Sequence, residues 1–99
     1  MTTFDDFIAE IEAEARLQGP DAVAELEAFR LHFSLARQIA AQRRAQHLTQ
    51  KQLAERSGIH QAEISRIERG QANPTTATLG ALIGALGLDV QLVPGHRAA

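Results

Sequence analysis

Residues 49–70 constrain the fold of this 99-residue chain more than any other segment. Thr49 and Gln52 have the spacing of a capping box, which predicts that a helix begins directly after Thr49. Gly58 can adopt the left-handed conformation that follows a helix C-terminus, so this helix is predicted to end at Ser57. The segment therefore predicts one short helix followed by a tight turn.

A second short helix is predicted over residues 61–69, ended by Gly70. Two helices joined by so few residues must cross steeply, which requires a small residue where the backbones meet, and Ala54 supplies it. The apolar side chains needed beneath the crossing are Leu53, Ile59, Ile64 and Ile67. Together these features predict a helix-turn-helix, whose second helix lies in the major groove of DNA.

Three further helices are predicted around this segment. Apolar residues at helical spacing predict a first helix over residues 3–17 and a long second helix from Pro20 to about Ala45, with a break allowed at 32–34. A last helix is predicted to begin at Thr75 or Thr76 and to reach about Leu86. The resulting fold class is an all-α bundle.

The alternating residues Val90, Gln91, Leu92 and Val93 predict a short strand. A strand needs a hydrogen-bonding partner, and no other segment of the chain predicts one. The simplest partner is the same strand from a second copy of the chain, so the sequence predicts a homodimer. The predicted organisation is an N-terminal helical arm (1–34), a DNA-binding domain (35–88) and a C-terminal dimerising strand and tail (89–99).

The net charge of −2 conceals a strong asymmetry along the chain. Residues 1–29 contain eight acidic residues and one arginine, whereas residues 30–70 contain eight basic residues and three acidic ones. This division indicates either two surfaces with different partners, one of them a polyanion, or only solvated helix faces.

Several classes of protein are not expected. The chain has no cysteine, no apolar run long enough to span a bilayer and an acidic N-terminus, so it reads as a soluble cytoplasmic protein without disulfides. His32, His47 and His96 lack zinc-ligand spacing, and no nucleophile–base pair is evident, so we expect no metal, no cofactor and no enzymatic activity. Gly80 and Gly84 interrupt an apolar helical pattern, which we attribute to close helix packing.

Several short motifs resemble the Cro and phage-repressor-like (XRE) helix-turn-helix family, whose fold is lambda-repressor-like. They are Leu48-Thr49-Gln50, Leu53-Ala54, Gly58-Ile59, the run from Ile64 to Gly70, Asn73-Pro74 and Thr78-Leu79. The similarity runs from about Leu35 to Leu88. Within that family, an acidic helical N-terminal extension and a short C-terminal strand resemble the HigA-type antitoxins. Such proteins repress their own operon and neutralise a RelE-like ribonuclease toxin.

The resemblance implies a set of DNA contacts. Candidate base-reading residues are Gln61, Ala62, Ser65 and Arg66, and Ala62 departs from relatives that carry an amide there. Candidate contacts to the DNA backbone are Gln50, Arg44, Lys51, His60, Arg69 and Asn73. Arg43 and Glu68 match positions that pair internally in the family.

The four phenylalanines, all in the first third of the chain, allow two interpretations. They pack the N-terminal helices together, or an apolar stripe formed by Phe4, Phe7, Ile8 and Ile11 binds a partner such as a basic ribonuclease toxin. The predicted function is a dimeric DNA-binding antitoxin. The alternatives are a stand-alone phage- or plasmid-type repressor and a protein-interaction adaptor on the same fold.

Overall fold

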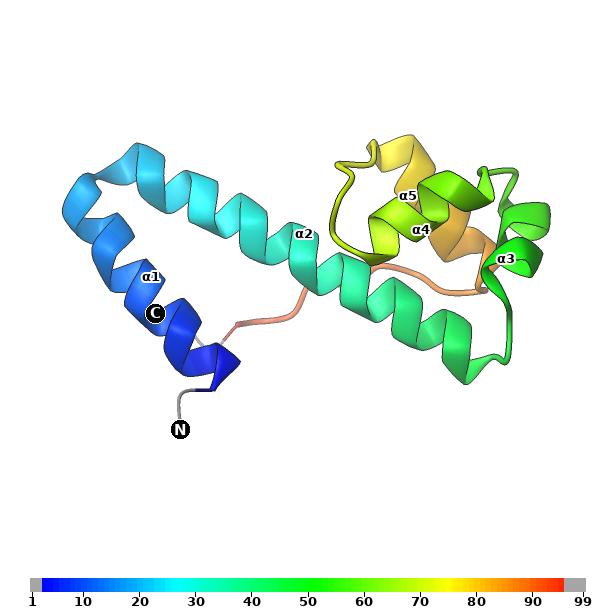
Figure 1. The fold of residues 1–99 in the computed structure, drawn as a ribbon, viewed down its shortest axis with the longest axis horizontal. Coiled ribbons are helices and arrows are strands. Elements are labelled where there is room, and N and C mark those ends of the chain that lie inside the picture. The colour runs from blue at the N-terminus through cyan, green and yellow to red at the C-terminus, as the bar shows by residue number, and fades with distance from the viewer. Residues whose placement is uncertain (1–2, 96–99) are drawn as a thin grey trace. The chain divides into compact units, whose positions relative to one another are not determined.

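The computed structural model describes residues 3–95, which form five α-helices and no strand (Figure 1). They are α1 (Phe4–Gln18), α2 (Pro20–Ala45), α3 (Gln50–Ser57), α4 (Gln61–Glu68) and α5 (Thr76–Ala85). The chain divides into two compact units, Met1–Leu35 and Ala36–Ala99, and α2 runs through the boundary. No helix of residues 3–95 has both the length and the apolar character that crossing a bilayer requires.

In the first unit, α1 and the beginning of α2 form a helical hairpin, called here the N-terminal hairpin (residues 3–35). A capping box between Thr3 and Asp6 begins α1, close to the predicted start. Glu12 of α1 forms an ion pair with Arg30 of α2. Ile8, Ala15 and Leu26 are buried in this unit. The predicted helices are therefore confirmed, and the burial of their apolar faces stabilises the pair.

The break that we allowed at residues 32–34 is wrong, because α2 is a single helix from Pro20 to Ala45. After Pro20 its sequence contains neither glycine nor proline, so no residue favours a break. Ala36, Ile39 and Ala40 continue its buried face beyond the allowed break.

The second unit contains one hydrophobic core to which the end of α2 and all three short helices contribute. Its buried members are Ile39, Leu48, Leu53, Ile64, Ile67, Leu82 and Leu86. Ala54 and Ile59 are partly buried against this cluster, as the predicted crossing of α3 and α4 requires. The predicted helix-turn-helix packing is confirmed.

The predicted caps are also present in this unit. Thr49 and Gln52 form a reciprocal capping box, and Gly58 has a φ of 76° after the end of α3. Thr75, rather than Thr76, caps α5 by accepting a hydrogen bond from the backbone N–H of Thr78. These local signals fix where the short helices begin and end.

His47 is the one residue other than glycine with a positive φ, 58°, in the described part of the chain. It follows α2, where its N–H donates to the carbonyl of Arg44 and the N–H of Leu48 donates to the carbonyl of Arg43. Such helix ends favour glycine because a Cβ is strained in the left-handed conformation. We expect His47→Gly to raise the free energy of unfolding by about 0.5–1 kcal/mol, measured by urea denaturation. His47→Ala is the control, because it removes the imidazole and keeps the strain; equal stabilisation by both variants would contradict this account.

Two predictions are wrong for a single chain. Val90–Val93 is not a strand, because residues 3–95 contain no second strand to form a ladder with it. Gly80 and Gly84 do not mark close packing within the chain, since a Cβ added at either position would meet nothing within 4 Å. Residues 96–99 of the predicted tail, including His96, and residues 1–2 of the arm lie outside the described residues.

Candidate nucleic-acid interface

Helix α4 presents one apolar face to the core and a polar face to solvent. Ile64 and Ile67 are 0% and 2% exposed. At about 100° per residue, the opposite side of the helix carries Ala62, Ser65 and Arg66, and Arg69 follows on the same side directly after the last residue of α4. Of these four residues, Ser65 is half-buried and the others are exposed. Gln61 is also exposed, at the first position of α4. Three of the four predicted base-reading residues, Ala62, Ser65 and Arg66, therefore share the side of α4 away from the core, and Gln61 is exposed at its start.

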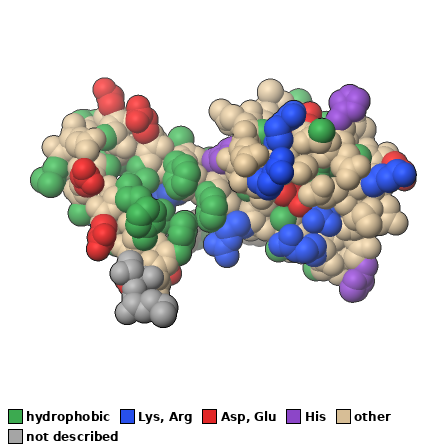
Figure 2. Space-filling model, viewed as in Figure 1, with side chains coloured by type: hydrophobic (Ala, Val, Ile, Leu, Met, Phe, Trp, Pro, Cys, Tyr) green, Lys and Arg blue, Asp and Glu red, His purple; other side chains and the backbone are tan. Residues whose placement is uncertain are grey.

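Five of the exposed cations in the second unit are available for contacts, and two of them belong to this surface. The five are Arg44, Lys51, Arg56, Arg66 and Arg69, and none forms an ion pair with a described residue. On the face drawn in Figure 2, lysine and arginine side chains gather on this unit, whereas acidic ones predominate on the other. Unpaired cations on a helix surface of this kind are suited to contact phosphates.

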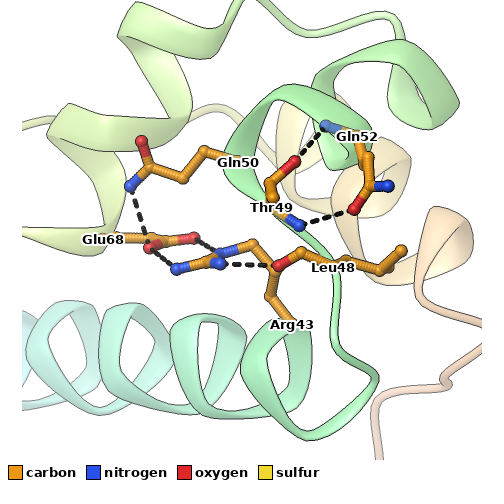
Figure 3. Close-up of polar contacts among 6 residues, drawn as sticks. All are labelled: Arg43, Leu48, Thr49, Gln50, Gln52 and Glu68. Atoms are coloured by element: carbon orange, nitrogen blue, oxygen red, sulfur yellow. Dashed lines mark hydrogen bonds and ion pairs between the residues drawn. The ribbon is translucent and has the colours of Figure 1, made fainter.

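Hydrogen bonds among three side chains, one each from α2, α3 and α4, fix the position of α4 in the second unit (Figure 3). Arg43 of α2 donates to both carboxylate oxygens of Glu68, from Nε at 2.7 Å and from Nη2 at 3.0 Å. Its Nη1 donates to the carbonyl of Leu48 at 2.7 Å. Gln50 of α3 donates from Nε2 to Glu68 Oε1 at 3.2 Å. This network, called here the Arg43–Glu68–Gln50 lock, joins the C-terminal end of α4 to α2 and α3.

The predicted internal pairing of Arg43 with Glu68 is thus confirmed. Both side chains are largely buried, with 12% of Arg43 and 6% of Glu68 exposed. The hydrogen bonds to Glu68 raise the pKa of the Arg43 guanidinium, an effect that burial opposes. Because the pair is bidentate and shielded from water, it is a strong constraint on how α4 crosses the rest of the unit.

Gln50 has a more restricted role than a free phosphate ligand. Its side-chain amide already donates one hydrogen bond to Glu68, so one amide hydrogen is left for a phosphate. As the first residue of α3, it also contributes a backbone N–H to the positive end of that helix. An anion at this point would be close to the lock that positions α4.

The other predicted backbone contacts lie at helix ends and in loops. His60 is the residue before α4 and makes no side-chain capping bond. Arg69 follows the end of α4, and Asn73 is exposed in the loop before α5. Lys51 is exposed in the first turn of α3. Contact of these residues with DNA stays a prediction.

The predicted partner stripe on α1 is only partly exposed. Phe4 and Phe7 are half-exposed, at 48% and 51%, whereas Ile8 is buried and Ile11 is half-buried. Sequence reasoning missed Phe29 of α2, which is 51% exposed and stacks on Phe33 with 6.1 Å between ring centroids. Phe4 stacks on the same ring at 5.1 Å. The spacing of Phe29 and Phe33, four residues apart, was the signal available in the sequence.

Within residues 3–95, no three histidine, aspartate or glutamate side chains are grouped closely enough to hold a metal ion. The exposed cations of the second unit are instead suited to binding an extended anion.

Comparison with known proteins identifies the class of fold. The helix-turn-helix family matches residues 39–93, more than half of the chain, and the chain belongs to this family. It is 37% identical over 70 residues to an uncharacterized HTH-type transcriptional regulator of Haemophilus influenzae, and the match covers 71% of each protein.

Two other relatives have more specific names. The chain is 39% identical over 64 residues to the immunity repressor protein of Bacillus phage phi105, a match that covers 65% of this chain and 44% of the repressor. It is 41% identical over 56 residues to the control protein C.SmaI of Serratia marcescens, covering 57% of this chain and 67% of that protein. The chain thus spans less than half the length of the phage repressor. No solved structure matches it significantly.

Proposed function

We propose that this protein is a sequence-specific DNA-binding transcriptional repressor that places α4 in the major groove. The observation that carries the proposal is the face of α4 opposite Ile64 and Ile67, which exposes Ala62 and Arg66 in a helix-turn-helix protein, with Gln61 exposed at the first position of the same helix. Relatives named as a repressor and as transcriptional regulators support the same function. When the protein is bound to DNA near a promoter, it would exclude the polymerase sterically.

Three exposed side chains of α4 are suited to contact base edges. Arg66 has the geometry to donate two hydrogen bonds to O6 and N7 of guanine. Gln61 fits adenine or a phosphate, and the methyl group of Ala62 fits that of thymine. Arg44, Lys51, His60, Arg69 and Asn73 would contact the DNA backbone and fix the register of α4 without reading sequence.

The test is a titration of labelled DNA from upstream of the gene, followed by fluorescence anisotropy, beside scrambled DNA of the same length. We expect tighter binding to the upstream DNA and affinity that falls as salt rises, because phosphate contacts release counterions. Equal, weak binding to both DNAs would favour the adaptor alternative, in which the fold is retained and DNA binding is lost.

A homodimer would place two α4 helices in successive major grooves about 34 Å apart. Three features support a second copy against α5 and the segment after it. Residues 70–88 carry no charge. Gly80 and Gly84 lie exposed inside α5 with open space around them, although each costs roughly 1 kcal/mol of helix stability relative to alanine. Val90, Leu92 and Val93 are 65%, 93% and 71% exposed. A second copy would cover these groups and give the glycines a packing role.

Gly84→Leu tests this dimer interface. In a single chain the new side chain has free space and a better helix propensity, so we expect the monomer to stay folded, as circular dichroism would show. The bulky side chain would separate two closely packed α5 helices, so the dimer is expected to dissociate in sedimentation experiments at high salt. Ala41→Leu, at an exposed position of α2, is the matched control and should stay dimeric. A dimeric Gly84→Leu variant would contradict the α5 interface.

The C-terminal segment has its own test within the same proposal. Removal of residues 90–99 is expected to give monomers that bind upstream DNA more weakly, since each monomer contacts one half-site. A truncated protein that stays dimeric would show that residues 90–93 are not needed for the interface.

We further propose that the N-terminal hairpin binds a cationic protein, as expected of a HigA-type antitoxin that neutralises a ribonuclease toxin. Its exposed rings, Phe4, Phe7 and Phe29, and its eight acidic residues against two arginines support a basic partner. Co-expression with the product of the adjoining open reading frame tests this. A stable complex that is lost in Phe7→Ser would support an antitoxin. No complex and no rescue of growth would leave the stand-alone repressor.

A further inference from the structure

The N-terminal hairpin carries carboxylates that its own cations do not neutralise. Among its residues, Arg16 and Arg30 are the basic ones, and both pair with Glu12. Glu10 and Glu25 are exposed and form no ion pair with a described residue. The hairpin therefore presents excess negative charge to whatever approaches it.

Aromatic rings lie beside these carboxylates. Glu10 lies three residues after Phe7, and Glu25 lies four residues before Phe29, spacings that put each pair on one side of its helix. The Phe29 ring is continuous with Phe33 and Phe4 through stacking. Figure 2 shows hydrophobic side chains gathered on this unit, with acidic side chains around them. We call this surface, formed by Phe4, Phe7, Phe29, Glu10 and Glu25, the aromatic–acidic face.

Arginine is the side chain that such a face fits best. A guanidinium group stacks on an aromatic ring and pairs with a neighbouring carboxylate at the same time. The same chain carries a matching surface, because Arg66 and Arg69 on the outer side of α4 are exposed and have no ion-pair partner in residues 3–95.

We propose that the aromatic–acidic face of one copy docks on the α4 arginines of a second copy. The contact is heterologous, because it joins two different surfaces, and it therefore extends from copy to copy instead of closing as a two-fold dimer does. It occupies the side chains that the proposed function assigns to DNA. Docking on the α4 arginines of a copy and DNA binding by that copy are then mutually exclusive, so each copy whose arginines are covered cannot bind DNA.

Sedimentation velocity of the full chain over a concentration series tests the contact, with refractive-index detection because the chain has no Trp or Tyr. At about 10 mM salt, where the Debye length is roughly 30 Å, we expect the mass to rise with concentration to at least about twice its value at about 1 M salt. A short DNA duplex added at low salt should dissolve the assemblies, because phosphates compete for Arg66 and Arg69.

Charge exchange identifies the surfaces. Glu10→Lys/Glu25→Lys and Arg66→Glu/Arg69→Glu should each abolish the salt-sensitive association when alone, and a mixture of the two variants should restore it. Glu55→Lys, the same charge change at an exposed position of α3, should associate like the wild type. Circular dichroism establishes that the variants are folded.

Three results would overturn the proposal: a mass independent of salt, association that persists in either double variant alone, or a mixture that fails to associate. These outcomes are separate from those of the proposed function, because the α5 dimer is measured at high salt and DNA binding is measured on upstream DNA. The head-to-tail contact can therefore fail while the repressor function holds, and the reverse is also true.

Discussion

Arg66→Ala is expected to weaken binding to the upstream DNA by about 1–3 kcal/mol, roughly 5- to 150-fold, and to reduce its preference over scrambled DNA. The side chain is exposed on α4 and has no ion pair with a described residue, so its removal leaves the core intact. What is lost is a bidentate donor to guanine, which scrambled DNA does not present at that position. Anisotropy titrations on both DNAs measure the two affinities.

Lys51→Ala is the matched comparison for Arg66→Ala. Lys51 is exposed in the first turn of α3, and its predicted contact is a phosphate. We expect this variant to weaken binding to both DNAs similarly and to lower the salt slope by about 1. If Arg66→Ala behaved like Lys51→Ala, with an unchanged preference, Arg66 would be a phosphate contact and the assignment of base reading to it would be wrong.

Glu68→Ala is expected to have the largest effect on stability, a loss of about 3–5 kcal/mol in the free energy of unfolding. Glu68 accepts hydrogen bonds from Arg43 and Gln50, and only 6% of its side chain is exposed. Its removal leaves the Arg43 guanidinium largely buried without its carboxylate. Because a domain of this size has only about 5–15 kcal/mol of stability, much of the total would be lost. Urea denaturation followed by circular dichroism measures the change.

Two variants show whether the effect of Glu68→Ala comes from the buried pair. Glu63→Ala removes another carboxylate of α4, one that makes no ion pair with a described residue, and it should change stability by less than about 1 kcal/mol. Arg43→Met/Glu68→Leu removes both charges and keeps apolar volume, and it should recover much of the lost stability. A Glu68→Ala variant as stable as Glu63→Ala would contradict the role given to the Arg43–Glu68–Gln50 lock.

The part of the fold that could be predicted from sequence is the part with local causes. The capping box of Thr49 and Gln52 acts over three residues, and Gly58 ends α3 through its own backbone conformation. The periodicity of Ile64 and Ile67 also determines which side of α4 faces solvent. For these reasons the outer face of α4 followed from the sequence before any contact was known.

The predictions that were wrong depend on packing or on a second molecule. The burial of Ile8 and the exposure of Phe29 result from how α1 meets α2, which helical periodicity on α1 alone does not determine. Gly80 and Gly84 were attributed to close helix packing, but within this chain the space around them is open, so any packing role comes from another molecule. The hydrogen bond from Gln50 to Glu68 joins residues 18 positions apart and has no local signal.

Methylation protection of the upstream DNA tests the central claim most directly, because it probes guanine N7 in the major groove, the atom that Arg66 is expected to bind. The account predicts two groups of protected guanines, about one helical turn apart on one side of the duplex, and loss of both groups with Arg66→Ala. Protection unchanged by Arg66→Ala, or no protected guanine on DNA that the protein binds tightly, would contradict the placement of α4 in the major groove.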